Sequence, residues 1–517
     1  MRPPAAGPAG KAAFWLVLLA LLARTLLFHA DLIRFPYPLD GHEPAQEELA
    51  RGVAQGLSSG DASTFPMMVS VYGPVYSLLT GGLCRLGLAC DLQGQRALCA
   101  LLLAALLVLL AAVCLRSGAG VLGTAALLAW GYELLLINVT PIARPDALGL
   151  LLWFAGLAAP FLLGESLPVL ALTAALFALA AATKLYFLCG PLYLAAGLAL
   201  AGRWRALGRF AVLQSAALLA AGLWLAHSFP LDLYVGALNQ TTNLTFDTAY
   251  LLWQCRRVLL DASPFALPLL ACTAWWRWRA RGTGAGSAGS GGAWGVYAGV
   301  GMALFVLFLG GALGARFTYL IQLVLLPCLA WFAGALPSSG RWRPVVLTLL
   351  LGNALCTAQA LALHPGLEPD GTVAREWRRA GALVELARRP MVCADLDFTL
   401  RARGLKVYDT GLNNCDFLLR PRDPRLVRAL LPRLPELIDR YQAWLNAAWG
   451  DALDPRTDLL AVHDGSPLAF GGAVRDRFVP IGTLHVDYPQ TQGFETITCY
   501  VPRAGPSQAL AQALQQH

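Results

Sequence analysis

The segment ALCALLLAALLVLLAAVCL, residues 97–115, has only apolar side chains over a length that matches a membrane-spanning helix. Similar runs recur along the chain, in which 57% of the 517 residues are hydrophobic and 14% are charged. This composition excludes a soluble multidomain protein and predicts a polytopic α-helical membrane protein with about 11 transmembrane helices. We expect the spans at about 12–30, 97–115, 121–139, 147–163, 167–182, 185–201, 210–227, 258–275, 294–311, 317–336 and 345–363.

Arginine-rich loops alternate along the chain with loops that lack this bias. By the positive-inside rule, the arginine-rich side, which includes the N-terminus, is the cytoplasm. The first apolar run is interpreted as a retained signal anchor, since no small-residue cleavage site follows it. The cytoplasmic arginines explain most of the net charge of +8 and favour anionic lipid headgroups, so no nucleic-acid partner is expected. These arginines are Arg116, Arg203, Arg205, Arg209, Arg277, Arg279, Arg281, Arg341 and Arg343.

Two polar regions lie on the predicted external side. Residues 31–96 form a first external loop, whose apolar stretch to about residue 89 is broken by Gly81, Gly82 and Arg85 and is therefore predicted to be interfacial. After residue 364 the composition becomes polar and mixed, which predicts a soluble α/β domain over 364–517, beside a transmembrane domain over 1–363. Within 364–517 we expect helices at 372–388 and 424–447, and strands at 391–394, 405–408, 483–488 and 494–501.

The twelve cysteines show no CxxC or Cys/His spacing, so no zinc site is predicted. Cys393, Cys415 and Cys499 are placed in an oxidising compartment, where one disulfide among them is compatible with the sequence but the pair is undetermined. A GxGxxG match at 284–289 lies in a flexible Gly/Ser-rich linker, residues 282–292, without a preceding strand, and has almost no weight as a dinucleotide site.

Two carboxylates, Asp40 and Glu43, follow the first apolar run within Leu39-Asp40-Gly41-His42-Glu43. A carboxylate near the lipid boundary is costly to leave without a partner, so a functional site is the first interpretation. The alternative is a solvated loop carboxylate or an N-cap for a helix beginning near Pro44.

Cations and a third acid lie at the same predicted level. Arg144-Pro145-Asp146 fixes a cation and an anion in a tight turn between two apolar runs, which favours a functional site. The alternative interpretation is that Asp146 only caps the next helix and Arg144 only extends to the membrane surface. Lys184 is the one lysine inside the membrane portion, and its ammonium is suited either to snorkelling or to binding a phosphate. Three arginines of this level are boundary anchors individually, and together they suit an anionic headgroup. They are Arg24, Arg256 and Arg316.

The order of these motifs resembles the GT-C superfamily of integral-membrane glycosyltransferases, which contains the protein O-mannosyltransferases and the lipid A aminoarabinose transferases. The resemblance covers residues 14–320. It rests on the acidic first loop from Asp40 to Gly56, on Tyr72-Gly73-Pro74-Val75-Tyr76, on Arg144-Pro145-Asp146 and on Thr183-Lys184. One departure is that many relatives carry adjacent Asp-Glu in the first loop, whereas this chain has His42-Glu43.

The resemblance implies transfer of a sugar from a polyprenyl-phosphate donor to an acceptor hydroxyl or amine on the external face, with inversion. It implies that Asp40 or Glu43 is the base and that Asp146 is an orienting acid or a metal ligand. No particular cofactor is implied, and a divalent metal is left open. The expected partners are the lipid-linked donor, a glycan, lipid or protein acceptor, and membrane lipids. The cations assigned to the donor phosphate are Arg144, Lys184, Arg316, Arg256 and Arg24.

Two other classes are weighed against this hypothesis: a secondary transporter of a small anionic or sugar-like solute, and a non-catalytic membrane scaffold. A transporter typically places its charges near the midplane and shows an internal repeat, whereas here the charges gather at one face and no repeat is evident. The expected location is a bacterial inner membrane, with a cytoplasmic N-terminus and an external C-terminal domain.

The predicted orientation has a direct test. A cysteine introduced at Gly41 or near Asp464 should react with a membrane-impermeant thiol reagent in intact cells, because both positions are predicted to be external. A cysteine in the 282–292 linker should react only after permeabilisation. Labelling of the linker in intact cells would reverse the topology.

Overall fold

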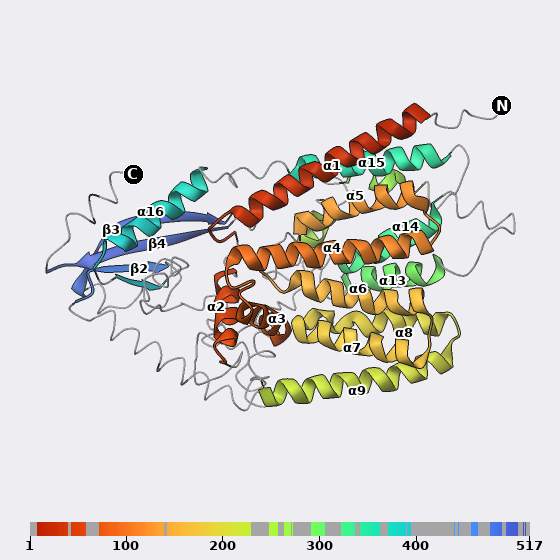
Figure 1. The fold of residues 1–517 in the computed structure, drawn as a ribbon, viewed down its shortest axis with the longest axis horizontal. Helices are drawn as coiled ribbons and strands as arrows, with labels where there is room; N and C mark the ends of the chain where they lie inside the picture. Colours follow the sequence, from red (N-terminus) through yellow and green to blue (C-terminus); the bar gives the residue numbers. More distant parts are fainter. Residues whose placement is uncertain are drawn as a thin grey trace.

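The computed structural model describes residues 8–39, 43–57, 72–138, 142–228, 248–256, 263–269, 291–305, 322–336, 342–361, 371–388, 390–393, 456–463, 476–488 and 493–504, with a few single positions elsewhere. Most of these residues are helical, and the long helices lie side by side in one bundle (Figure 1). Its main helices are α1 (Pro8–Arg34), α4 (Leu92–Arg116), α5 (Gly120–Asn138), α6 (Asp146–Leu163), α7 (Leu167–Thr183), α8 (Gly190–Leu200), α9 (Trp204–Ser228), α11 (Thr248–Arg256), α13 (Gly291–Leu304), α14 (Gln322–Ala335) and α15 (Trp342–Leu361).

The bundle has the apolar outer surface of a membrane protein. Four of the described helices, α1, α4, α6 and α9, are long and apolar enough to cross a bilayer, and five shorter apolar helices accompany them. Large apolar side chains such as Leu101, Val108 and Leu219 are mostly exposed on the outside. Lipid is as apolar as a protein core, so such helices are hydrophobic all round. The structure confirms the predicted polytopic helical class.

Short connections make successive helices antiparallel. Charged residues at the helix ends therefore lie at one or the other end of the bundle. The α4–α5 turn contains Gly118 and Gly120, both with positive φ, which glycine adopts without a steric penalty. Asp146 at the start of α6 and Lys184 just after α7 therefore lie at one end (Figure 1), which we call the sheet end because the C-terminal sheet is there. The opposite end, with Arg116 and Arg203, is called the arginine end.

Two short helices, α2 (Glu43–Ala54) and α3 (Pro74–Arg85), pack on one another at the sheet end (Figure 1). Each has 12 residues, which is too short to span a bilayer. A disulfide joins Cys84, in the last turn of α3, to Cys90 in the loop that follows, and no cysteine pattern in the sequence predicted it. Cys499, one of the three predicted external cysteines, is a buried free thiol; Cys415 lies outside the described residues.

The C-terminal region contains α16 (Thr372–Leu386) and a sheet of β1 (Pro390–Cys393), β2 (Leu459–His463), β3 (Phe478–Tyr488) and β4 (Gly493–Pro502). The strand order is β1-β2-β4-β3, with β1 parallel to β2 and the other pairs antiparallel. The sequence predicted α16, β1, β3 and β4 but missed β2. The segments predicted at 405–408 and, but for two single positions, 424–447 lie outside the described residues, as does the proposed domain boundary near 363.

This C-terminal unit shares a hydrophobic core with the sheet end of the bundle. Leu32 and Phe35 near the end of α1, and Leu39 and Ile142 in the loops, are buried with residues of α16 and the sheet. The ring of Tyr37 stacks on the buried Trp377 of α16, with ring centroids 6.1 Å apart and an interplanar angle of 8°. Burial of these apolar groups fixes the two loop segments that lead to Asp40 and Arg144.

Candidate functional site

The ion pair between Asp146 and Lys184 is the centre of the candidate site. Lys184 lies in extended backbone just after α7, and its Nζ is 2.7 Å from Oδ1 of Asp146, the first residue of α6. The Tyr186 hydroxyl donates to the same Oδ1 at 2.9 Å. Both charged side chains are buried, so each needs the other as a partner. α6 and α7 pack closely because Gly156 of α6 leaves room for the ring of Phe177 of α7. Gly149 of α6 likewise leaves room for the ring of Phe187, three residues after Lys184.

Arg144 brings a second cation to Asp146. Its Nε lies 3.5 Å from Oδ2 of Asp146, and its Nη2 donates to the hydroxyl of Tyr72 at 3.1 Å. The Tyr72 ring lies 4.5 Å from Nζ of Lys184, close enough for a cation–π interaction. The backbone N–H of Gly73 donates to the carbonyl of Thr183 at 3.1 Å, which ties this segment to the end of α7. The cluster has two cations and one carboxylate, so it is suited to attract an anion.

A second buried ion pair, between Glu43 and Arg96, lies beside this cluster. Both side chains have an exposed fraction of 0%. The guanidinium binds the carboxylate in a bidentate way, with Nε 2.9 Å from Oε1 and Nη2 2.6 Å from Oε2. Arg96 also donates to the carbonyls of Leu32, Phe35 and Tyr37. All five N–H donors of its guanidinium are thereby satisfied.

The Glu43 carboxylate also binds two loop backbones. Oε2 accepts a hydrogen bond from the N–H of Leu39 at 2.7 Å, and Oε1 accepts one from the N–H of Ala143 at 2.7 Å. These residues directly precede Asp40 and Arg144 in the chain. Four donors occupy the carboxylate, so its geometry fits a positioning role better than proton acceptance. Asp40, the other candidate base, lies outside the described residues.

Tyr76 lies between the two clusters. Its hydroxyl is 3.4 Å from Oε1 of Gln95 and 3.5 Å from Sγ of Cys99. Complete burial raises the pKa of the Tyr76 phenol well above its ordinary value, and Cys99 and the carboxylates of Glu43 and Asp146 raise it further. The phenol therefore stays neutral at physiological pH.

Of the remaining predicted phosphate contacts, Arg24 is engaged in another part of the bundle. Arg24 pairs with Glu133 of α5 at 3.4 Å and donates to the carbonyl of Ala358 in α15. Thr25 donates to the same Glu133 at 2.9 Å, so this is a separate polar cluster on α1, α5 and α15, in which Thr25 and Glu133 are buried. Arg256 ends α11 with an exposed side chain, and Arg316 lies outside the described residues.

Several residues of the site were missed by sequence reasoning. Tyr186 follows Lys184 by two positions, and Arg96 is a lone charge at the start of a long apolar helix, which is a usable pattern. Glu133, in the cluster with Arg24, is likewise a lone charge within an apolar run and could have been found by the same pattern. Within the described ranges, no group of three or more His, Cys, Asp or Glu side chains is arranged to hold a metal ion. Asp146 instead faces two cations and a phenol.

The bundle, the two short helices at its sheet end and the C-terminal sheet together form a fold that is also found in a solved structure. The chain is similar over its whole length to a crystal structure of ArnT from Cupriavidus metallidurans bound to undecaprenyl phosphate. The TM-score is 0.56 and the identity 14%, and the match covers 98% of this chain and 99% of the other. No model of a protein family and no curated protein matches the chain.

The buried Glu43–Arg96 pair yields a stability prediction. Glu43→Gln keeps the shape of the side chain but leaves the Arg96 cation buried without a counter-ion, so the free energy of unfolding should fall by about 3–5 kcal/mol. The matched control is Glu47→Gln, which breaks the half-exposed i,i+4 pair with Arg51 and should cost less than about 1 kcal/mol. Thermal unfolding in detergent measures both.

A third variant separates charge from packing. In Glu43→Gln/Arg96→Met neither charge of this pair remains, so part of the lost stability should return. Equal and small losses in Glu43→Gln and Glu47→Gln would contradict a central role for this pair.

Proposed function

We propose that the chain is a glycosyltransferase that takes a sugar from a polyprenyl-phosphate donor and transfers it to an acceptor hydroxyl or amine. The observation that carries this proposal is the buried cluster of Arg144, Asp146 and Lys184 at the sheet end of a GT-C fold. The ArnT structure of the same fold is bound to undecaprenyl phosphate, which supports a lipid phosphate as the anion recognised here.

The proposed reaction is a direct displacement at the anomeric carbon. The acceptor oxygen or nitrogen forms a bond to that carbon as the bond to the phosphate oxygen breaks, and a base takes the acceptor proton. Negative charge grows on the departing lipid phosphate, so the leaving group needs cations rather than an acid. Lys184 and Arg144 supply them, and Asp146 holds the two cations in position.

Asp40 is the proposed base. Its backbone follows Leu39, which is anchored both by the Glu43 carboxylate and by burial against the C-terminal unit. Glu43 is proposed to position this loop and the Arg144 loop together, because its oxygens bind the residue before each. Pre-organisation of the base relative to the phosphate site lowers the barrier without any contact between Glu43 and substrate.

The sheet end is proposed to be the external face of a bacterial inner membrane, because the opposite end holds the arginine-rich loops. The C-terminal region, residues 364–517, is proposed to help select the acceptor. Its contact with the loop before Asp40 supports this role. A glycan, a lipid and a protein are all acceptors compatible with the proposed chemistry.

Donor recognition is testable with undecaprenyl phosphate itself as the ligand. Lys184→Met and Arg144→Gln should each weaken its binding about 10- to 100-fold, because a charge-assisted contact to phosphate contributes about 1.5–3 kcal/mol. Lys11→Met, which removes an exposed lysine near the N-terminus, is the control and should bind normally. Affinities of both variants equal to that of the wild type would assign these cations to membrane anchoring.

The base is tested by turnover. Asp40→Asn removes the proton-accepting charge at nearly constant size, so release of undecaprenyl phosphate from a panel of undecaprenyl-phosphate sugars should slow by about 10²-fold or more. Binding of undecaprenyl phosphate should be unchanged. The control is Asp31→Asn, an exposed carboxylate at the end of α1. Turnover by Asp40→Asn at the wild-type rate would remove the catalytic role of this residue.

A further inference from the structure

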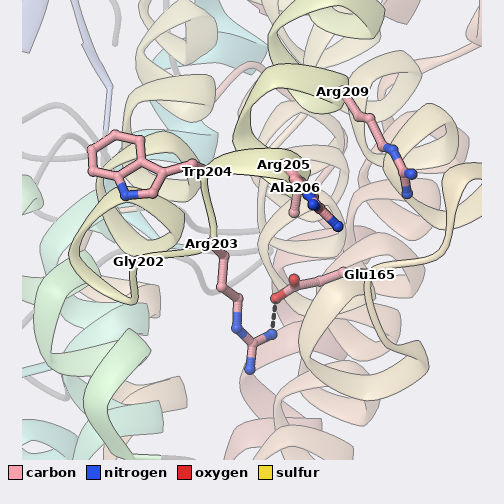
Figure 2. Close-up of a pocket in the computed structure, with 7 residues that line it drawn as sticks. All are labelled: Glu165, Gly202, Arg203, Trp204, Arg205, Ala206 and Arg209. Atoms are coloured by element: carbon pink, nitrogen blue, oxygen red, sulfur yellow. Dashed lines mark hydrogen bonds and ion pairs between the residues drawn. The ribbon is translucent and has the colours of Figure 1, made fainter.

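A pocket at the arginine end is not used by the proposed reaction. It has a volume of about 520 Å³ and lies where the α6–α7 connection meets the start of α9 (Figure 2). Arg203 is ion-paired with Glu165 across it. The residues that line it are Glu165, Gly202, Arg203, Trp204, Arg205, Ala206 and Arg209.

The pocket carries an excess of positive charge. Three guanidinium groups line it, and Glu165 is the one acid among its lining residues. Arg205 and Arg209 are one helical turn apart on α9 and both are exposed, so their charges repel each other. They also occupy the first turns of a 25-residue helix with no acid in its first turn, where the helix dipole disfavours cations. An anion in the pocket would relieve both effects.

The positive-inside rule alone does not explain this arrangement. It accounts for arginines at this end of the bundle, and Arg116 is an example. Arg116, however, lies in the last turn of α4, where the helix dipole favours a cation. Arg205 and Arg209 lie at the unfavourable end of α9, on the wall of a pocket, and beside a third arginine held by an ion pair.

The surroundings of the pocket point to lipid. α9 is the outermost helix on its side of the bundle (Figure 1), and its Val212, Leu219 and Leu223 are mostly exposed. Trp204, 67% exposed at the rim of the pocket, turns its indole away from the arginines (Figure 2). An exposed indole at the end of an apolar helix is typical of the headgroup level of a bilayer.

We propose that this pocket binds the phosphate of an anionic phospholipid, with Arg205 and Arg209 as the phosphate contacts. Glu165 orients Arg203 at the wall, and the acyl chains of the lipid lie along the exposed apolar face of α9. Basic pockets between transmembrane helices at the cytoplasmic level recognise such headgroups by the same chemistry. The site is independent of the proposed glycosyl transfer.

The test measures thermal unfolding of the full chain in nanodiscs of phosphatidylcholine, with and without phosphatidylglycerol. Phosphatidylglycerol should raise the Tm of the wild type, because a ligand that binds only the folded state stabilises it. In Arg205→Gln/Arg209→Gln the apparent affinity for phosphatidylglycerol should be ~30-fold weaker, since each removed cation accounts for a factor of about 5 to 6 in binding at the membrane surface. Both side chains are exposed, so this variant should fold.

Two controls define the chemistry and the source of the phosphate. Arg209→Gln and Arg116→Gln each remove one charge from the same end, but only the first should weaken the response to phosphatidylglycerol. Arg205→Lys/Arg209→Lys should restore part of it. A rise in Tm with phosphatidylglycerol that is undiminished in Arg205→Gln/Arg209→Gln would overturn the proposal. An equal rise in the Tm of the wild type with inorganic phosphate in phosphatidylcholine discs would also overturn it, because the site would then bind free phosphate.

Discussion

The buried pair of Glu43 and Arg96 is the interaction on which the arrangement of the sheet end depends. Two opposite charges with no exposed surface are stable only if every donor and acceptor has a partner. Here the guanidinium donates hydrogen bonds to carbonyls at the end of α1. The carboxylate accepts hydrogen bonds from the N–H groups of the residues that precede Asp40 and Arg144. One ion pair thus joins three parts of the chain that are distant in sequence: the segment from Leu32 to Glu43, the start of α4 with Arg96, and the loop at Ala143.

The cluster around Asp146 uses the same physics for a different purpose. A carboxylate buried between Lys184 and Arg144 holds two cations close together that would otherwise repel each other. The net charge of the cluster remains positive, so it retains attraction for a phosphate. The Glu43 carboxylate is fully occupied by four hydrogen-bond donors. The Asp146 cluster, by contrast, has the excess positive charge that an anion-binding site requires.

The two ends of the bundle carry positive charge in different forms. At the sheet end the cations are buried and held by a carboxylate and by phenols, which suits recognition of one defined phosphate. At the arginine end they are exposed on α9 around an open pocket, which suits the mobile headgroups of a membrane leaflet. The exposed apolar flanks of the helices between them are the surface expected of a protein whose solvent is lipid.

The sequence alone determined the helical membrane class, because long apolar runs have no alternative solution in a bilayer. It also marked Arg144, Asp146 and Lys184 as candidate site residues, because charge next to lipid is rare enough to be conspicuous. Only the tertiary structure decided that these three meet, that Arg24 pairs with Glu133 instead, and that Arg96 is the partner of Glu43. Such pairings depend on how helices pack across large sequence separations, and local patterns carry no record of that packing.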